Sequence, residues 1–129
     1  MSKWDRRFLD LAAGMATWSK DMSTQVGAII VDRDQRIVSS GYNGFPRGVV
    51  DSIERYQDRD TKYRMVVHAE INAILFAKRD LTGCTIYVHP FMPCARCAAM
   101  VIQTGIKRVV YPPASEDILS RWADDLRLS

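Results

Sequence analysis

Two short clusters in the sequence carry side chains that could bind a metal ion and move a proton. The first is His68-Ala-Glu70, at the end of an apolar run, and the second is the Cys-x-x-Cys pair Cys94 and Cys97, directly after Pro93. One imidazole and two thiolates suit zinc, and three protein ligands leave the fourth tetrahedral position for water, as in catalytic zinc sites. Glu70 would then be free to act as an acid or base beside that water. We therefore predict a catalytic zinc site.

Each cluster taken alone has an ordinary explanation. A carboxylate in the first turn of a helix is favoured by the positive helix N-terminus, so Glu70 could be a simple capping residue. The Cys-x-x-Cys pair could be a redox pair, or could arise by chance in an alanine-rich helix. His89 is a conceivable fourth ligand, although nothing else in the sequence favours it. The joint occurrence of both clusters at predicted helix starts favours the metal site.

The hydrophobic pattern predicts alternating helices and strands in a single domain over residues 1–129. The expected helices span residues 3–19, 69–79, 94–104 and 115 onwards, the last including Leu119, Trp122 and Leu126. The expected strands span residues 26–32, 36–42, 85–89 and 106–111, with a short helix near residues 52–60. This order predicts an α/β fold, a three-layer αβα sandwich whose mixed sheet has four to five strands.

The predicted architecture brings the two clusters together. The first two strands form an antiparallel hairpin, whereas the second half implies parallel pairing with right-handed crossovers. Two neighbouring parallel strand-helix units place their helix N-termini at one edge of the sheet, which is where ligands bind in open α/β sheets. Helix N-termini also stabilise thiolates. We therefore expect His68 and Glu70 to lie beside Cys94 and Cys97.

The composition narrows the function classes. The 129 residues are 47% hydrophobic and 26% charged, with a net charge of +3. Charged residues 54–64 mix both signs, whereas a nucleic-acid binder more often shows a one-sided basic face. No apolar run approaches the roughly 18 residues of a membrane span, and the N-terminus has no signal-peptide pattern. Three cysteines disfavour a disulfide framework, and Cys84 is expected to be buried. We expect a cytoplasmic protein without membrane or nucleic-acid partners.

The chain resembles the cytidine/deoxycytidylate deaminase superfamily, and most closely its deoxycytidylate (dCMP) deaminase family. The matching segments cover nearly the whole chain and are QVGAIIV at 25–31, GYNG at 41–44 with Pro46 and Gly48, HAEINAI at 68–74, PCARCA at 93–98 and GIKRVVY at 105–111. The zinc motif alone indicates the superfamily. The GYNG-x-P-x-G and HAE-x-NAI forms favour the dCMP branch. The resemblance implies that Glu70 carries a proton from an activated water to N3 of cytosine, so that dCMP becomes dUMP and ammonia.

The resemblance also implies substrate contacts. Asn43 is the best candidate to hydrogen-bond the deoxyribose, and the backbone of Ala69 to touch the pyrimidine carbonyl. Tyr111 either lines the pocket or contacts the phosphate, although a strand-end aromatic also packs in this way for structural reasons. Thr24, Arg47 and the charged connection over residues 54–64 are candidates for phosphate contacts, although a solvated surface explains any one of them.

Further expectations concern the cofactor, the partners and the competing functions. Some family members hold a second, structural zinc, but residues 49–64 contain no His or Cys, so we expect one zinc per chain. A homo-oligomer is implied, and some members respond to dCTP and dTTP, although no effector site is located here. The alternatives are a tRNA adenosine deaminase, a free cytidine deaminase and a non-catalytic binding module. The intact metal set and Glu70 argue against the last.

Overall fold

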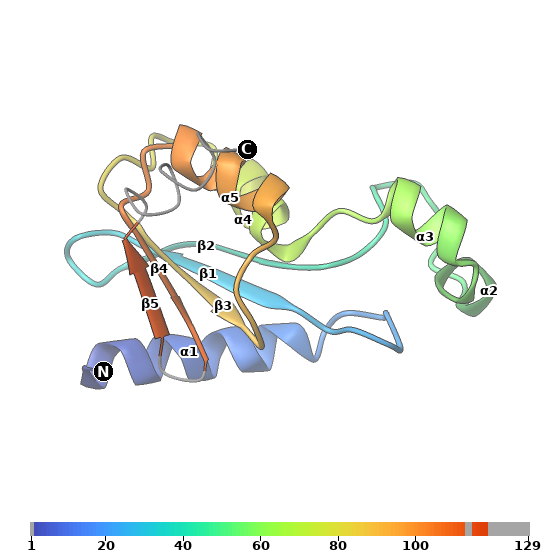
Figure 1. Ribbon diagram of the computed structural model, residues 1–129, viewed down its shortest axis with the longest axis horizontal. Coiled ribbons are helices and arrows are strands. Elements are labelled where there is room, and N and C mark those ends of the chain that lie inside the picture. The colour runs from blue at the N-terminus through green and yellow to red at the C-terminus, as the bar shows by residue number, and fades with distance from the viewer. Residues whose placement is uncertain (1, 113–114, 119–129) are drawn as a thin grey trace.

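A mixed five-stranded sheet forms the centre of the computed structural model, which describes residues 2–112 and 115–118 (Figure 1). Its strand order is β2-β1-β3-β4-β5. The bounds are Gly27–Val31 for β1, Ile37–Tyr42 for β2, Thr85–His89 for β3, Arg108–Tyr111 for β4 and Ser115–Ile118 for β5. Strand β1 runs antiparallel to both neighbours, β3 and β4 are parallel, and β5 is antiparallel to β4. The predicted mixed sheet is confirmed.

Helices cover both faces of the sheet, which completes the three predicted layers (Figure 1). Helix α1 (Lys3–Ala16) follows its N-cap residue Ser2, whose hydroxyl accepts a hydrogen bond from the Asp5 N–H. It lies on one face, where Phe8 packs with Tyr87. Helices α4 (Ala69–Ala77) and α5 (Ala95–Gln103) lie on the other face, over the larger apolar cluster. Trp4 and Leu11 of α1 are exposed and lie outside the buried cluster around Phe8.

Two short helices form an arm that projects from the sheet (Figure 1). They are α2 (Ile53–Gln57) and α3 (Arg59–Met65), in the region where one short helix was expected. Helix α3 buries none of its residues. An isolated helix of this length is unstable in water, so the arm depends on contacts with the body. One such contact is the backbone pairing of Gly44 with Val67 at the base of the arm.

Two predictions about the fold are wrong. The strand-helix units that carry the chemical clusters are not neighbours in the sheet, since β1 lies between β2 and β3. The predicted helix from residue 115 is instead the edge strand Ser115–Ile118, because pairing with β4 outweighs the local helix-start pattern. Leu119, Trp122 and Leu126 lie outside the described residues. Within residues 2–112 and 115–118, no helix has the length and apolar character needed to cross a membrane.

Candidate metal centre

The site is built from the first residues of α4 and α5. These helices follow β2 and β3, which run in the same direction because both are antiparallel to β1. Their N-termini therefore reach the same edge of the sheet. This shared edge was predicted from the sequence, although the two strands were expected to be neighbours. His68 is the N-cap residue of α4 and Cys94 that of α5, and neither side chain caps its own helix. Both are free to face each other across the gap between the helices.

Three donor atoms converge at this edge in an arrangement that fits zinc. The donor atoms of His68, Cys94 and Cys97 all lie within 4.8 Å of one another. His68 Nδ1 is 3.1 Å from Cys97 Sγ and 3.7 Å from Cys94 Sγ. Tetrahedral zinc with nitrogen and sulfur ligands separates two donors by about 3.6 Å. Cys97 is buried, whereas His68 and Cys94 are exposed.

Glu70 lies beside these donors and is almost completely buried, with 3% of its surface exposed. Burial raises the pKa of Glu70 above its usual range, and a backbone hydrogen bond and the charge of His68 offset this only in part. Burial, together with Glu70 and Cys94, also raises the pKa of Cys97. A bound cation reverses that effect on a thiol, because it favours the thiolate. A metal cation at this site would therefore favour the charged forms of both the buried Glu70 carboxyl and the buried Cys97 thiol.

A cavity of about 200 Å³ lies in front of the donor atoms. Of the substrate contacts expected from the sequence, Thr24, Asn43 and Ala69 line it, together with His68, Glu70 and Cys94. Arg47 and Tyr111 do not. Arg47 is exposed, with its guanidinium 5.3 Å above the Phe76 ring, and lines a separate cavity of about 890 Å³. Tyr111 packs against the apolar cluster under α4 and α5.

The Asn43 side chain lines the cavity and is also held by hydrogen bonds within the protein. Its Oδ1 accepts a hydrogen bond of 2.9 Å from the Val26 N–H, and its Nδ2 donates to the Thr24 carbonyl at 2.9 Å. The side chain is 6% exposed. The amide is therefore fixed in one orientation at the cavity wall, and its contact with a sugar stays a prediction. His89, the conceivable fourth ligand, is outside the donor group.

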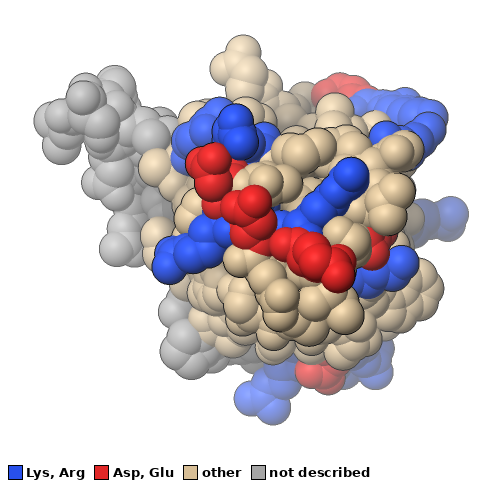
Figure 2. Space-filling model, turned by 90° about the vertical axis from the view of Figure 1, so that its right-hand side faces the viewer, with Lys and Arg blue, Asp and Glu red and all other residues tan. Residues whose placement is uncertain are grey.

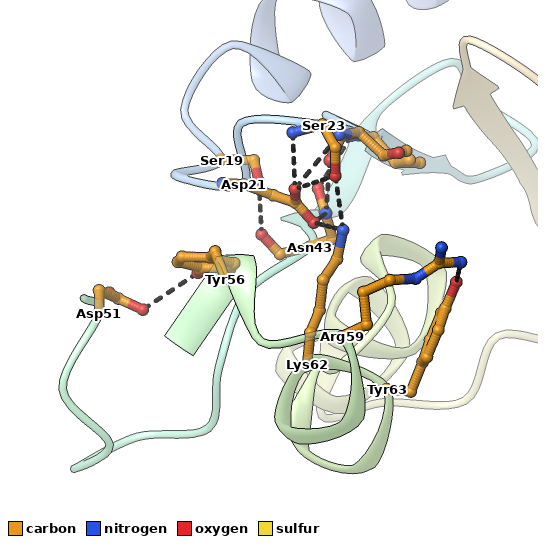
Figure 3. Close-up of polar contacts among 11 residues, drawn as sticks. Ser19, Asp21, Ser23, Asn43, Asp51, Tyr56, Arg59, Lys62 and Tyr63 are labelled. Atoms are coloured by element: carbon orange, nitrogen blue, oxygen red, sulfur yellow. Dashed lines mark hydrogen bonds and ion pairs between the residues drawn. The ribbon is translucent and has the colours of Figure 1, made fainter. Parts of the chain in front are cut away.

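A polar network that also lines this cavity was not predicted from the sequence (Figure 3). Asp21 is 1% exposed, and its Oδ1 accepts hydrogen bonds from Ser23 and from the Thr24 N–H. The Lys62 ammonium lies 2.8 Å from Asp21 Oδ2 and 2.8 Å from Ser23 Oγ. Burial raises the pKa of Asp21, but the hydrogen bonds from Lys62 and the Ser23–Thr24 loop outweigh it and lower the pKa. This network joins α3 to the loop before β1.

Comparison with known proteins places these features in one family. The model of the cytidine and deoxycytidylate deaminase zinc-binding region matches residues 2–112. A deaminase from the luxG 3′ region of Aliivibrio fischeri is 54% identical over 129 residues, which is 100% of this chain and 86% of that protein. Homo sapiens deoxycytidylate deaminase is 43% identical over 115 residues, and the match covers 84% of this chain and 64% of the human protein.

A solved structure agrees with these matches. It is dCMP deaminase from the cyanophage S-TIM5 in complex with dCMP and dUMP, with a TM-score of 0.74 and 25% identity over 86% of this chain and 82% of that one. The family's zinc-binding region and the His68, Cys94 and Cys97 donor group together fit a single zinc site.

Proposed function

The chain belongs to the family of cytidine and deoxycytidylate deaminases, and from that premise we propose that it hydrolyses dCMP to dUMP and ammonia. The relatives named above as acting on dCMP support this substrate. The observation that carries the proposal is the convergence of one imidazole and two thiols beside a buried carboxyl, at the wall of a small cavity. The proposal assigns His68, Cys94 and Cys97 to zinc and Glu70 to proton transfer.

The residues of the chain would divide the chemistry among them. Zinc, when bound, would supply a water molecule of lowered pKa. The Glu70 carboxylate would accept the proton of that water and pass it to N3 of the cytosine ring as the hydroxide adds to C4. It would then carry the proton of the new C4 hydroxyl to the amine, so that the C4–N bond breaks, ammonia leaves and a carbonyl remains at C4. Glu70 is buried, lines the cavity and lies next to the donor group, which suits a group that must exchange a proton with both water and substrate.

Binding of the pyrimidine and its sugar is assigned to two groups on the cavity wall. The first N–H groups of α4 have no partner within the helix, so the backbone at Ala69 can donate to the pyrimidine carbonyl. Asn43 Oδ1 accepts one bond, from Val26, and an amide oxygen has a second lone pair, which is available to the deoxyribose hydroxyl. Because the protein fixes the amide, the substrate is bound without a further cost of ordering that side chain.

The face of the molecule that carries the arm favours a small substrate over RNA. Figure 2, which views the arm formed by α2 and α3, shows acidic and basic side chains interleaved on that face. An RNA-binding face is usually basic throughout. A tRNA adenosine deaminase is therefore the weaker candidate, and a cytidine deaminase would gain nothing from a cation beside the cavity.

The proposal includes a cytoplasmic homo-oligomer. The three cysteines are free thiols, which suits a reducing compartment. Leu75 and Phe76 on α4 are 61% and 50% exposed, and neighbouring exposed apolar residues often mark a protein contact. Light scattering coupled to size exclusion would give the mass of the assembly, and a monomer at micromolar concentration would contradict this part of the proposal.

Turnover of candidate substrates tests the reaction. The zinc-loaded protein should release ammonia from dCMP with a kcat/KM well above those for cytidine and for an adenosine-containing tRNA anticodon stem-loop. Loss of the cytosine absorbance and chromatography of the product give the rates. Faster turnover of cytidine or tRNA would move the chain to another branch of the family.

A further inference from the structure

A second cavity adjoins the metal centre, on the side away from the metal ligands. It has a volume of about 430 Å³ and lies between the loop before β1 and helix α3. Four residues line both cavities, namely Asp21, Thr24, Lys62 and Tyr63. A ligand whose ring lies at the metal donors would therefore meet these shared residues at its other end. Such a ligand needs a ring at one end and a group that suits α3 at the other.

The second cavity is rich in groups that attract an anion. Lys62 and Arg59 both line it. Within the described part of the chain, Lys62 is also the one lysine or arginine that lines the metal cavity. Its side chain is only 16% exposed, so solvent screens its charge less than that of a surface lysine. The Arg59 guanidinium donates one hydrogen bond, to Tyr63 Oη at 2.8 Å, and carries further donors.

The contacts of Lys62 leave it able to bind an anion. Two donors of its ammonium are used, one by Asp21 and one by Ser23, and a third remains. Asp21 also accepts hydrogen bonds from the Ser23 N–H and hydroxyl, the Thr24 N–H and Asn43 Nδ2. These four donors satisfy the buried carboxylate, so Lys62 can share its charge with a ligand. Figure 3 shows the ammonium rising from α3 to this loop.

We propose that Lys62 is the residue that makes this chain select a nucleotide over a nucleoside, by binding the 5′-phosphate where the two cavities meet. Arg59 adds a second positive charge in the outer cavity, and Asp21 is a positioning residue that holds the Lys62 ammonium toward the cavity. This inference rests on the proposed function, because it takes the pyrimidine to lie at the metal donors. It also assigns the phosphate to α3 rather than to Arg47, which lines the separate cavity beside β2.

The role of Lys62 is tested by the selectivity between nucleotide and nucleoside rather than by activity alone. In Lys62→Met, the ratio of kcat/KM for dCMP to that for deoxycytidine should fall about 10- to 100-fold, the equivalent of one lost hydrogen bond between charged groups. Lys62→Arg should recover most of the ratio. Lys107→Met, at an exposed lysine outside both cavities, is the matched control and should keep the wild-type ratio. Calorimetric titration with dUMP and deoxyuridine gives the same comparison at equilibrium.

The outcomes separate this inference from the proposed function. A lysine that only supports the fold would, when removed, lower turnover of both substrates by the same factor, and an unchanged ratio would overturn the inference. Thermal unfolding of each variant shows whether the protein is folded. If wild-type protein deaminates dCMP but Lys62→Met keeps its selectivity, Lys62 is wrong and the proposed function stands. If wild-type protein does not act on dCMP, the proposed function fails, and this inference with it.

Discussion

The metal centre and the Asp21–Lys62 network both line one cavity but are built in different ways. The metal centre uses the first residues of two helices that are fixed over the sheet by the larger apolar cluster. The network uses a loop and a short helix that buries none of its own residues. Under the proposed function, the helix starts that are fixed over the sheet hold the reacting groups, while the loop and α3 bind the phosphate end of the substrate. Each of the following variants should affect mainly the metal centre or mainly the Asp21–Lys62 network.

Removal of a metal ligand should have the largest effect. We expect Cys97→Ala to lose zinc and to have no detectable activity, because the buried thiol is one of three protein donors. Elemental analysis and the ammonia assay measure the two quantities. Cys84→Ala, which alters a buried cysteine outside the donor group, is the control and should retain both zinc and turnover. Retention of stoichiometric zinc in Cys97→Ala would exclude this thiol as a ligand.

Replacement of the acid-base residue should separate chemistry from metal binding. Glu70→Gln keeps the size of the side chain but cannot exchange a proton, so kcat for dCMP should fall at least about 100-fold while zinc stays bound. Glu54→Gln, on the exposed surface of α2, is the matched control. If Glu70→Gln loses its zinc instead, the carboxylate supports the metal rather than the proton transfer.

Replacement of Asp21 should weaken the Asp21–Lys62 network and leave the metal in place. Asp21→Asn keeps an oxygen for the loop N–H groups but removes the charge that pairs with Lys62, so the free energy of unfolding should fall by about 1–3 kcal/mol at pH 7. Urea unfolding measures this loss, and Asp10→Asn on the exposed side of α1 is the control. A double-mutant cycle with Lys62→Met should show coupling, and additive losses would mean that the pair contributes nothing as a pair.

The same aspartate predicts a pH dependence. Because the folded protein lowers the pKa of Asp21, its stabilisation is present above the unfolded value of about 3.9 and is lost as the pH falls through the folded pKa. Wild-type stability should therefore decline more steeply below about pH 4 than that of Asp21→Asn. Both proteins lose zinc in acid, so the difference between them is the readout. Equal slopes would show that Asp21 is not ionised in its network.

The metal centre was predictable from sequence because each cluster is local. One residue separates His68 from Glu70, and two separate Cys94 from Cys97, so spacing and a helix start suffice to indicate the chemistry. The pairing that brings the clusters together was only partly predictable, since the alternation of strands and helices does not reveal that β1 inserts between β2 and β3. The direction of the strands was sufficient to place the two clusters at one edge of the sheet, even though the predicted strand neighbours were wrong.

The Asp21–Lys62 network could not be predicted in the same way. Lys62 and Ser23 are separated by 39 positions, and Lys62 lies in a stretch of mixed charges that suggests only a solvated surface. Nothing in its neighbours indicates burial, because α3 has no apolar face against the body. The edge strand at Ser115–Ile118 was missed for a related reason, since a short strand depends on pairing with β4 more than on its own residues.

The source of the new oxygen atom tests the central claim most directly. The reaction of dCMP in water enriched in oxygen-18, followed by mass spectrometry of the product, reports whether water replaces the amine. Hydrolysis at the metal centre predicts one oxygen-18 atom in the base of dUMP and one ammonia per dUMP formed, with Lys62→Met retaining this stoichiometry and Glu70→Gln giving almost no product. Unlabelled dUMP, or dUMP formed without equivalent ammonia, would contradict the account.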